Sequence, residues 1–327
     1  MSEPAADSPS STRTCPVCGS PTRIVWDNLY DDRYGYPGTF TLRACRSCGH
    51  RFVAAAFSPA ELTDLYTRYY PRGRLSLDEF RPYVEAHGFR AWLQGERASA
   101  FRWVPRGVRI LDVGCGFGET LAYHQARGCE AHGVEADENI LRVAERFGLN
   151  AKAGLFDPMD YEPASFDYVT LDQVIEHVAS PIEFLSGVAT VLRPGGVAVI
   201  STPNSRSYAA RLLGRRWINW HVPYHLQQFT RRSLAITAQR SGLSVVSTQT
   251  ITNAAWLQYQ WFHLFSCPPP TKASPFWDPG RSKRRIPRGM RRSAAVLERA
   301  KAFHLVTRVA DGIGSGDNFL CVLQKPT

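Results

Sequence analysis

The sequence has no long apolar segment. Hydrophobic residues make up 44% of its 327 positions, yet no run approaches the roughly 20 apolar residues of a transmembrane helix. Residues 1–14 are polar, rich in Ser, Pro and Ala, and without the apolar stretch of a secretory signal peptide. We therefore expect a disordered tail at 1–14 and a cytoplasmic protein without membrane spans.

Cysteine is concentrated in two C-x-x-C-G knuckles. The first contains Cys15 and Cys18, the second contains Cys45 and Cys48, and 26 residues separate them. Each knuckle turns two thiolates toward one centre, so the pair predicts a tetrahedral four-cysteine zinc site. Disulfides are the alternative, which a reducing compartment disfavours. We predict a zinc ribbon over residues 15–52 whose structural metal supplies most of its folding energy.

A glycine-rich turn follows a short aliphatic run. Ile110–Val113 leads into Gly114, Gly116 and Gly118, which alternate with other residues before a helical stretch. Alternating glycines let the backbone turn sharply and approach a ligand closely. The dinucleotide fingerprint G-x-G-x-x-G is absent, because no glycine stands at its third position. An ordinary strand-to-helix turn is the alternative to a ligand loop.

Further strands follow at the spacing of an alternating α/β fold. Ala131–Glu135 is predicted to be a second strand, and Glu135 lies 23 residues after Asp112. A carboxylate at that place can accept hydrogen bonds from both hydroxyls of a ribose. The remaining strands are expected at 165–171, 197–201, 243–247 and 318–323. The order of these blocks predicts a mostly parallel sheet with a closing antiparallel strand.

These blocks resemble the core of the class I S-adenosylmethionine (SAM) methyltransferases over residues 106–327. The resemblance implies an α/β, Rossmann-like, seven-stranded sheet with helices on both faces, preceded by the zinc ribbon and a helical lid at 53–105. It also implies SAM as the cofactor, and we expect the side chain of Cys115 to line the cofactor cleft. The cofactor-binding residues expected from it are Asp112, Gly114, Cys115, Gly116, Phe117, Gly118, Glu135, Ala136, Leu155, Phe156, Asp157 and Leu171.

Three histidines are candidates for a catalytic base. His177 follows the fourth strand, while His221 and His225 follow the fifth. The carboxyl ends of parallel strands are where ligands bind in such sheets, and a hydroxyl acceptor needs a base. We rank His225 first, His221 second and His177 third. A structural role is the alternative for each of them.

The resemblance extends to two groups of methyltransferases. Glu176-His177 is similar to the Glu-x-x-Glu-His run of the quinone-pathway O-methyltransferases, which can hold a divalent ion. Here Gln173 replaces the first glutamate, which removes a charged ligand and argues against magnesium dependence. The paired knuckles resemble the zinc-ribbon methyltransferases that act on deoxysugars, glycans and other secondary metabolites.

We therefore expect O-methylation of a small molecule or a saccharide, including a lipid-linked one. The alternatives are an RNA methyltransferase whose zinc ribbon recognises RNA, a sugar C-methyltransferase and a non-catalytic zinc-ribbon binding protein. Nucleic acid is the less favoured partner.

An insertion at about 253–316 separates the last two strands. From 253 to 317 there are 11 Lys and Arg against 4 Asp and Glu, which is +7 of the chain's net +10. Aromatic and basic residues at 256–292 suit an anionic membrane surface, at the inner face of the membrane. They also suit RNA. The third interpretation is a solvated loop followed by a helix that covers the active site. An amphipathic helix is predicted at 293–310, with Val296, Phe303 and Val306 on one face.

Overall fold

A seven-stranded sheet forms the centre of the molecule. The computed structural model describes residues 14–327 apart from 56, 59–60, 62–63, 71–76 and 278–286, so the basic run at 281–286 and nearly all of the predicted tail lie outside it. The sheet contains β4 (Arg109–Val113), β5 (Glu130–Glu135), β6 (Asn150–Ala153), β7 (Phe166–Asp172), β8 (Leu192–Pro203), β10 (Ser244–Thr250) and β11 (Asn318–Gln324). Its order is β10-β11-β8-β7-β4-β5-β6. Strand β11 alone runs opposite to the other six strands, which confirms the predicted fold.

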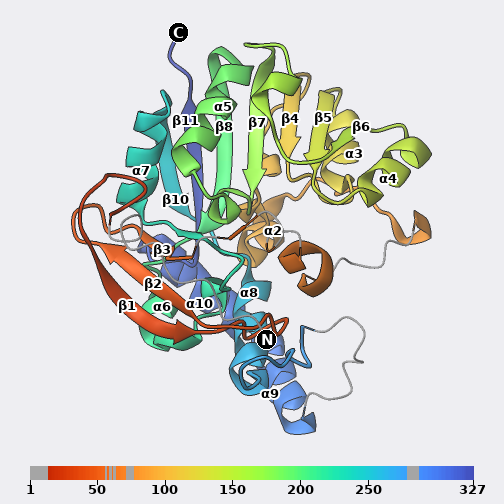
Figure 1. The fold of residues 1–327 in the computed structure, drawn as a ribbon. Helices are drawn as coiled ribbons and strands as arrows, with labels where there is room; N and C mark the ends of the chain where they lie inside the picture. Colours follow the sequence, from red (N-terminus) through yellow and green to blue (C-terminus); the bar gives the residue numbers. More distant parts are fainter. Residues whose placement is uncertain (1–13, 56, 59–60, 62–63, 71–76, 278–286) are drawn as a thin grey trace.

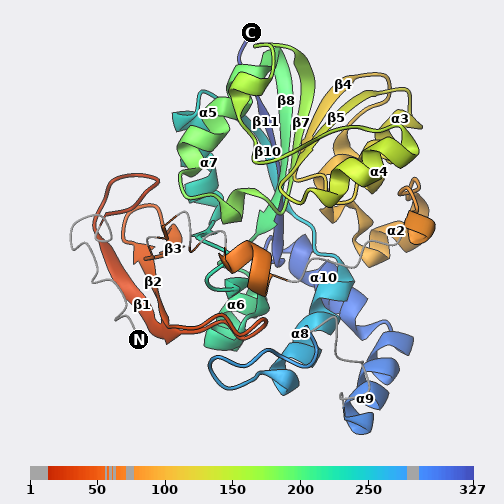
Figure 2. The same cartoon turned by 45° about the vertical axis from the view of Figure 1, so that its right-hand side comes forward.

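Helices cover both faces of this sheet. Helices α3 (Glu119–Gln125) and α4 (Asn139–Phe147) lie on one side, and α5 (Pro181–Val191) and α7 (Arg231–Arg240) on the other (Figures 1 and 2). The central strands are aliphatic on both faces because both are covered. Leu111, Val169 and Ile200, for example, are completely buried.

A second, four-stranded sheet contains the predicted ribbon. Its order is β1 (Thr22–Leu29), β2 (Phe40–Cys45), β3 (Arg51–Val53) and β9 (Gln227–Gln228). Strand β9 comes from the loop after β8, and it pairs with Arg51 and Phe52 of β3. The hydroxyl of Thr230, the residue that caps α7, donates to the Cys48 carbonyl at 3.2 Å. The ribbon is therefore joined to the loop that follows the fifth strand of the large sheet.

Short helical elements connect the two sheets. The segment predicted as a lid contains a π-helical turn at Leu65–Tyr69 and helix α2 (Gly88–Gln94). It also contains 3₁₀ turns at Leu77–Glu79, Glu96–Ala98 and Ala100–Trp103. Movement of this segment over the cofactor stays a prediction. Across the described ranges, every helix is too short or too polar to cross a bilayer.

The described part of the insertion between β10 and β11, residues 251–277 and 287–317, contains three helices. They are α8 (Ala254–Ser266), α9 (Arg288–Arg299) and α10 (Ala302–Gly312). The single helix predicted at 293–310 is wrong, because Lys301 adopts a left-handed conformation with φ of 54° and separates α9 from α10. Phe303 is buried as predicted, whereas Val296 and Val306 are 62% and 45% exposed.

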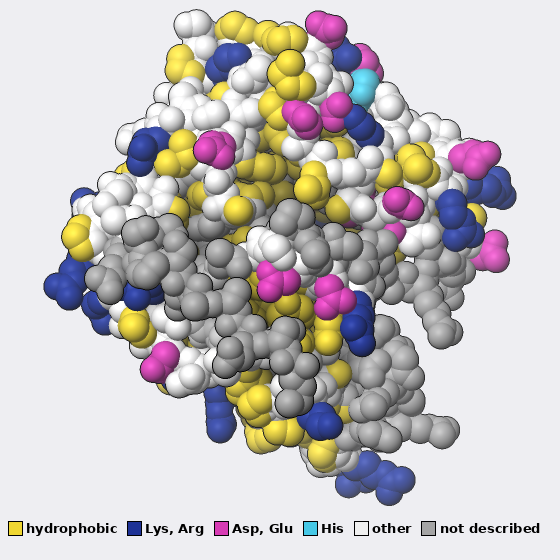
Figure 3. All heavy atoms as spheres, in the orientation of Figure 1, with side chains coloured by type: hydrophobic (Ala, Val, Ile, Leu, Met, Phe, Trp, Pro, Cys, Tyr) yellow, Lys and Arg dark blue, Asp and Glu magenta, His cyan; other side chains and the backbone are white. Residues whose placement is uncertain are grey.

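The carboxyl ends of the parallel strands face the lower half of the molecule in Figure 1. The ribbon, α6 (Tyr208–Leu213), α8 and α10 gather there. Hydrophobic side chains are visible in the middle of this view of the surface, with acidic and basic side chains scattered around them (Figure 3). The elements that carry the predicted site therefore meet at the carboxyl ends of the parallel strands, between the large sheet and the ribbon.

Candidate active site

The glycine-rich turn joins β4 to α3 and has an open side. Gly116 and Gly118 both have positive φ, 58° and 84°. A Cβ on Gly118 would lie 2.7 Å from Leu149 Cδ1, so packing against the core requires glycine there. A Cβ on Gly116 would meet nothing within 4 Å. The turn is thus packed on its inner side and leaves room for a ligand at Gly116.

Glu135 lies beside this opening. It ends β5, the parallel neighbour of β4. Its Oε2 accepts a hydrogen bond from the Gly116 amide at 3.0 Å, and its Oε1 accepts one from the Asp137 amide at 3.0 Å. An amide donor and a carboxylate acceptor at one opening fit a nucleoside with ribose hydroxyls. The residues present therefore fit SAM.

Asp112 supports the turn from below. Its carboxylate is 2% exposed and accepts hydrogen bonds from the hydroxyls of Thr120 and Thr170, the latter at 2.6 Å. Burial raises the pKa of Asp112 to about 6. These bonds join β4 to α3 and β7, so the side chain of this predicted cofactor residue positions the turn.

The side chain of Cys115 lies elsewhere than the sequence predicted. Its side chain does not line the cleft but lies in the core beside Leu121, and a Cβ on Gly133 would come within 2.7 Å of its sulfur. Burial raises the pKa of its thiol. A small side chain is needed here because β5 passes directly beneath the turn.

The other predicted cofactor residues differ in accessibility. Phe117 is partly buried and Ala136 is exposed. Leu171 is completely buried in the main core. Among the residues expected to frame adenine, Leu155 is 82% exposed, and Phe156 packs against Phe184 with ring centroids 5.5 Å apart. The Asp157 carboxylate caps the turn at Pro158–Asp160 by accepting from the Met159 amide.

All three predicted histidines come together. His177 lies in the turn Ile175–His177 after β7, and His221 and His225 lie in the loop after β8. The ring centroids of His177 and His225 are 4.7 Å apart, and those of His221 and His225 are 4.8 Å apart. The turn after β7 and the loop after β8 thus bring the three rings to one place.

Burial keeps these histidines neutral. It lowers the pKa of His177 to about 4 and, with smaller effects of neighbouring positive charges, lowers the pKa values of His221 and His225 well below 6.5. The positive charge of Arg33 acts in the same direction on all three. An imidazole with a lowered pKa is unprotonated at neutral pH and can accept a proton.

Glu176 completes a group that could hold a divalent ion. Ligand atoms of Glu176, His177 and His225 lie within 4.8 Å of one another. The Glu176 Oε2 accepts from the Thr202 hydroxyl at 2.9 Å, and burial raises the pKa of Glu176 to about 8. Gln173 is absent from this group, because its amide donates to the Ser201 hydroxyl at 2.8 Å and to Asn318 at 2.9 Å.

The loop between β1 and β2 of the ribbon reaches the histidines. The ring of Tyr34 lies 5.5 Å from that of His221 and 5.4 Å from that of Tyr224. Asp31 fixes this loop, because its carboxylate accepts from the amides of Arg33, Tyr34 and Tyr36 at 2.9–3.0 Å. Sequence reasoning missed these residues. The one available signal was the charged and aromatic run 31–36 between the knuckles.

Tyr70 packs against the aromatic residues of the histidine cluster. Its ring lies 5.4 Å from that of Tyr34, 5.3 Å from that of Tyr224 and 6.3 Å from that of His221. Burial raises the pKa of Tyr70. A residue of the predicted lid segment therefore contributes to the surroundings of the histidines.

The insertion packs over the same loops. The Gln260 amide oxygen accepts from the Ile218 amide at 2.7 Å, and His263 lies 3.0 Å from the Asp32 carboxylate. The Trp277 ring lies 4.5 Å from the guanidinium carbon of Arg33. These contacts favour the interpretation that the insertion covers the active site.

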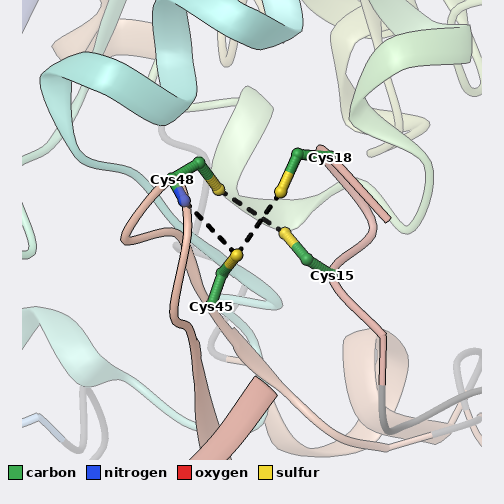
Figure 4. Close-up of side chains that lie close together, drawn as sticks. All are labelled: Cys15, Cys18, Cys45 and Cys48. Atoms are coloured by element: carbon green, nitrogen blue, oxygen red, sulfur yellow. Dashed lines mark hydrogen bonds between the residues drawn. The ribbon is translucent and has the colours of Figure 1, made fainter. Parts of the chain in front are cut away.

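The four knuckle cysteines point toward one centre (Figure 4). Their sulfur atoms approach to 3.6 Å for Cys15 and Cys48 and to 3.4 Å for Cys18 and Cys45. Tetrahedral zinc with Zn–S bonds of about 2.3 Å places sulfurs about 3.8 Å apart, so the set fits zinc. None of the eight cysteines forms a disulfide. His50 is no ligand, because it bonds Gln227 and Ser233.

Comparison with known proteins agrees with this geometry. A family model described as "Methyltransferase domain" matches residues 78–248. A ubiquinone biosynthesis O-methyltransferase of Ralstonia nicotianae is 32% identical over 50% of this chain and 73% of its own. The protein of the same name from Aeromonas salmonicida is 30% identical over 51% and 74%. A solved N1-methyltransferase of Burkholderia thailandensis with bound 1,6-didemethyltoxoflavin and S-adenosylhomocysteine is 15% identical, covers 86% of this chain and 98% of its own, and has a TM-score of 0.45. The chain therefore belongs to the methyltransferase domain family and is a SAM-dependent methyltransferase.

Proposed function

We propose that this enzyme transfers the methyl group of SAM to an acidic hydroxyl, phenolic or enolic, of a small molecule. The observation that carries the proposal is the cluster of three histidines that follow β7 and β8. Strand β7 is the parallel neighbour of β4, the strand that leads into the glycine-rich turn. The relatives named as O-methyltransferases support the same reaction type.

The cofactor would be held at the ends of β4 and β5. The Gly116 amide and the Glu135 carboxylate are the polar groups at the opening, and Asp112 keeps the turn in place. Bound SAM supplies a methyl group already activated by its sulfonium. The protein then has to align the acceptor hydroxyl and remove its proton.

His225 is the best placed base. Its Nδ1 lies 2.9 Å from the Asn219 carbonyl oxygen, which can only accept, so Nδ1 carries the proton. The neutral ring then presents the Nε2 lone pair. His177 is held in the same way by the Tyr224 carbonyl at 3.1 Å, and the Nε2 of His221 is buried without a partner among the described residues.

The low basicity of these histidines favours an acidic hydroxyl. A base whose pKa is about 4, as for His177, is poorly matched to an aliphatic alcohol. It is better matched to a phenol, whose pKa is near 10. We therefore place a saccharide acceptor second. Contact of residues 256–292 with an anionic membrane stays a prediction.

Methyl transfer to matched acceptors tests this function. Purified enzyme and SAM are incubated with catechol or with methyl glucoside, and both S-adenosylhomocysteine and the methylated product are measured by mass spectrometry. We expect turnover of catechol and none of the glucoside. Methylation of the glucoside alone, or of RNA alone, would reject the proposal.

Removing the Glu135 carboxylate should weaken SAM binding. Because a charged hydrogen bond contributes about 1.5–3 kcal/mol, Glu135→Ala should raise the dissociation constant at least about tenfold. Calorimetry measures this constant. Glu138→Ala, which removes an exposed carboxylate at the start of α4, is the matched control and should bind normally. Equal affinity of both variants would show that the ribose site lies elsewhere.

The pH dependence should differ from that of an ordinary histidine base. A base acts when unprotonated, so activity is complete above its pKa and lost as pH falls through it. Burial lowers the pKa of His177 to about 4 and that of His225 well below 6.5. We expect kcat/KM for catechol to stay level from pH 8 to 6 and to fall only below about 5. A half-maximal rate near pH 6.5 would contradict the neutral cluster.

A further inference from the structure

Arg33 is a charged side chain buried at the active site. Only 4% of it is exposed, and it lies in the loop between β1 and β2. Two contacts fix its backbone, since its amide donates to Asp31 at 2.9 Å and its carbonyl accepts from the Ser274 amide at 2.8 Å. Both the ribbon and the insertion thus hold this residue in place.

The guanidinium has neutral neighbours, among them the side chain of Tyr34. Its Nη2 donates to the Ile218 carbonyl, and one face lies against the Trp277 ring. Its Nε is buried without a hydrogen-bond partner, and no carboxylate oxygen lies within 4 Å among the residues that the structure describes. A buried charge without a counter-ion carries a large desolvation cost, so such a group calls for a ligand.

The nearby acids are already engaged. Asp31 accepts three backbone amides, and Asp32 pairs with His263. The Glu176 carboxylate accepts from the Thr202 hydroxyl at 2.9 Å. Tyr34, the next residue in the loop, has its ring 5.5 Å from that of His221. Arg33 therefore lies beside the histidine cluster, where the acceptor would bind.

We propose that Arg33 binds an anionic group of the acceptor, a carboxylate or a phosphate. The acceptor class is then a hydroxyl compound with an oxyanion substituent. A guanidinium is a planar fork that matches both oxyanions in a bidentate manner. The inference rests on the proposed function, because it places the acceptor at the histidine cluster.

This proposal gives the ribbon a part in substrate recognition. The loop that carries Arg33 and Tyr34 connects two ribbon strands, and its tyrosine lies against His221. Arg33 would bind the anionic group of the acceptor, and His225 would remove the proton from the hydroxyl of the same molecule. The ribbon would then select the acceptor, while the large sheet holds the cofactor.

Binding of small anions to the full-length enzyme tests the proposal. Enzyme saturated with S-adenosylhomocysteine is titrated with benzoate, with its neutral match benzamide and with inorganic phosphate against chloride at equal ionic strength. Nuclear magnetic resonance follows the histidine Cε1 proton signals. We expect benzoate or phosphate, but not benzamide or chloride, to bind and to shift signals of His177, His221 or His225. The anion that binds distinguishes a carboxylate from a phosphate acceptor.

Variants show whether Arg33 is responsible. Arg33→Gln should weaken anion binding at least about tenfold, and Arg33→Lys should retain part of it. Arg23→Gln, an exposed position on β1, should bind like the wild type. If Arg33→Gln does not fold, the anion affinity of Arg33→Lys is compared with that of the wild type, and a weaker affinity of the variant supports the proposal.

Two results would overturn the proposal. One is a wild type that binds neither anion more tightly than its control, and the other is an unchanged affinity in folded Arg33 variants. Methyl transfer to catechol by the wild type would still stand in both cases, so this failure is distinguishable from failure of the proposed function.

Discussion

Replacing His225 with alanine should lower turnover by about 100-fold or more, because the variant loses its general base. The affinity for SAM should change little, since His225 lies on the loop after β8 and Glu135 lies at the end of β5. Initial rates with catechol measure the first effect, and calorimetry with SAM measures the second. The combination separates loss of proton removal from loss of cofactor binding.

Three further variants make this test specific. His132→Ala removes a partly buried histidine on β5 that bonds Glu130 and Asn150, and it should keep normal turnover. His221→Ala and His177→Ala rank second and third in expected effect. Wild-type rates in all three cluster variants would mean that no histidine is the base. Catalysis would then rest on alignment of an acceptor that is already ionised.

The sequence was sufficient to predict the large sheet and to bring the histidines together. Strands of a parallel sheet are continuous apolar runs, and their carboxyl ends share one edge. His177 and His225 therefore had to lie near each other although 47 residues separate them. The spacing of the knuckles was equally informative, because two C-x-x-C turns have few other uses.

Contacts between segments far apart in the chain could not be predicted from the sequence pattern. Strand β9 has two residues, and its pairing with β3 joins Phe52 to Gln227 without any periodic pattern in the sequence. That pairing accompanies the approach of the Arg33 loop to the histidines. The break at Lys301 was missed for a related reason, since a lysine in the left-handed conformation has no sequence signal comparable to glycine.

Loss of zinc should disable the acceptor side of the enzyme. Cys48→Ser should abolish binding of about one zinc per chain. Metal binding supplies roughly 10–16 kcal/mol in zinc-finger peptides. Elemental analysis measures the metal. Cys267→Ser, which changes an exposed cysteine outside the cluster, is the control and should keep its zinc.

Loss of zinc should also destabilise segments outside residues 15–52. Strand β3 pairs with β9, and the Cys48 carbonyl accepts from Thr230 at the start of α7. We expect hydrogen exchange to accelerate at 218–230 and methyl transfer to be lost. SAM binding should persist, because Gly116 and Glu135 have their contacts within the large sheet. A zinc-free variant that methylates catechol at the normal rate would show that the ribbon takes no part in the acceptor site.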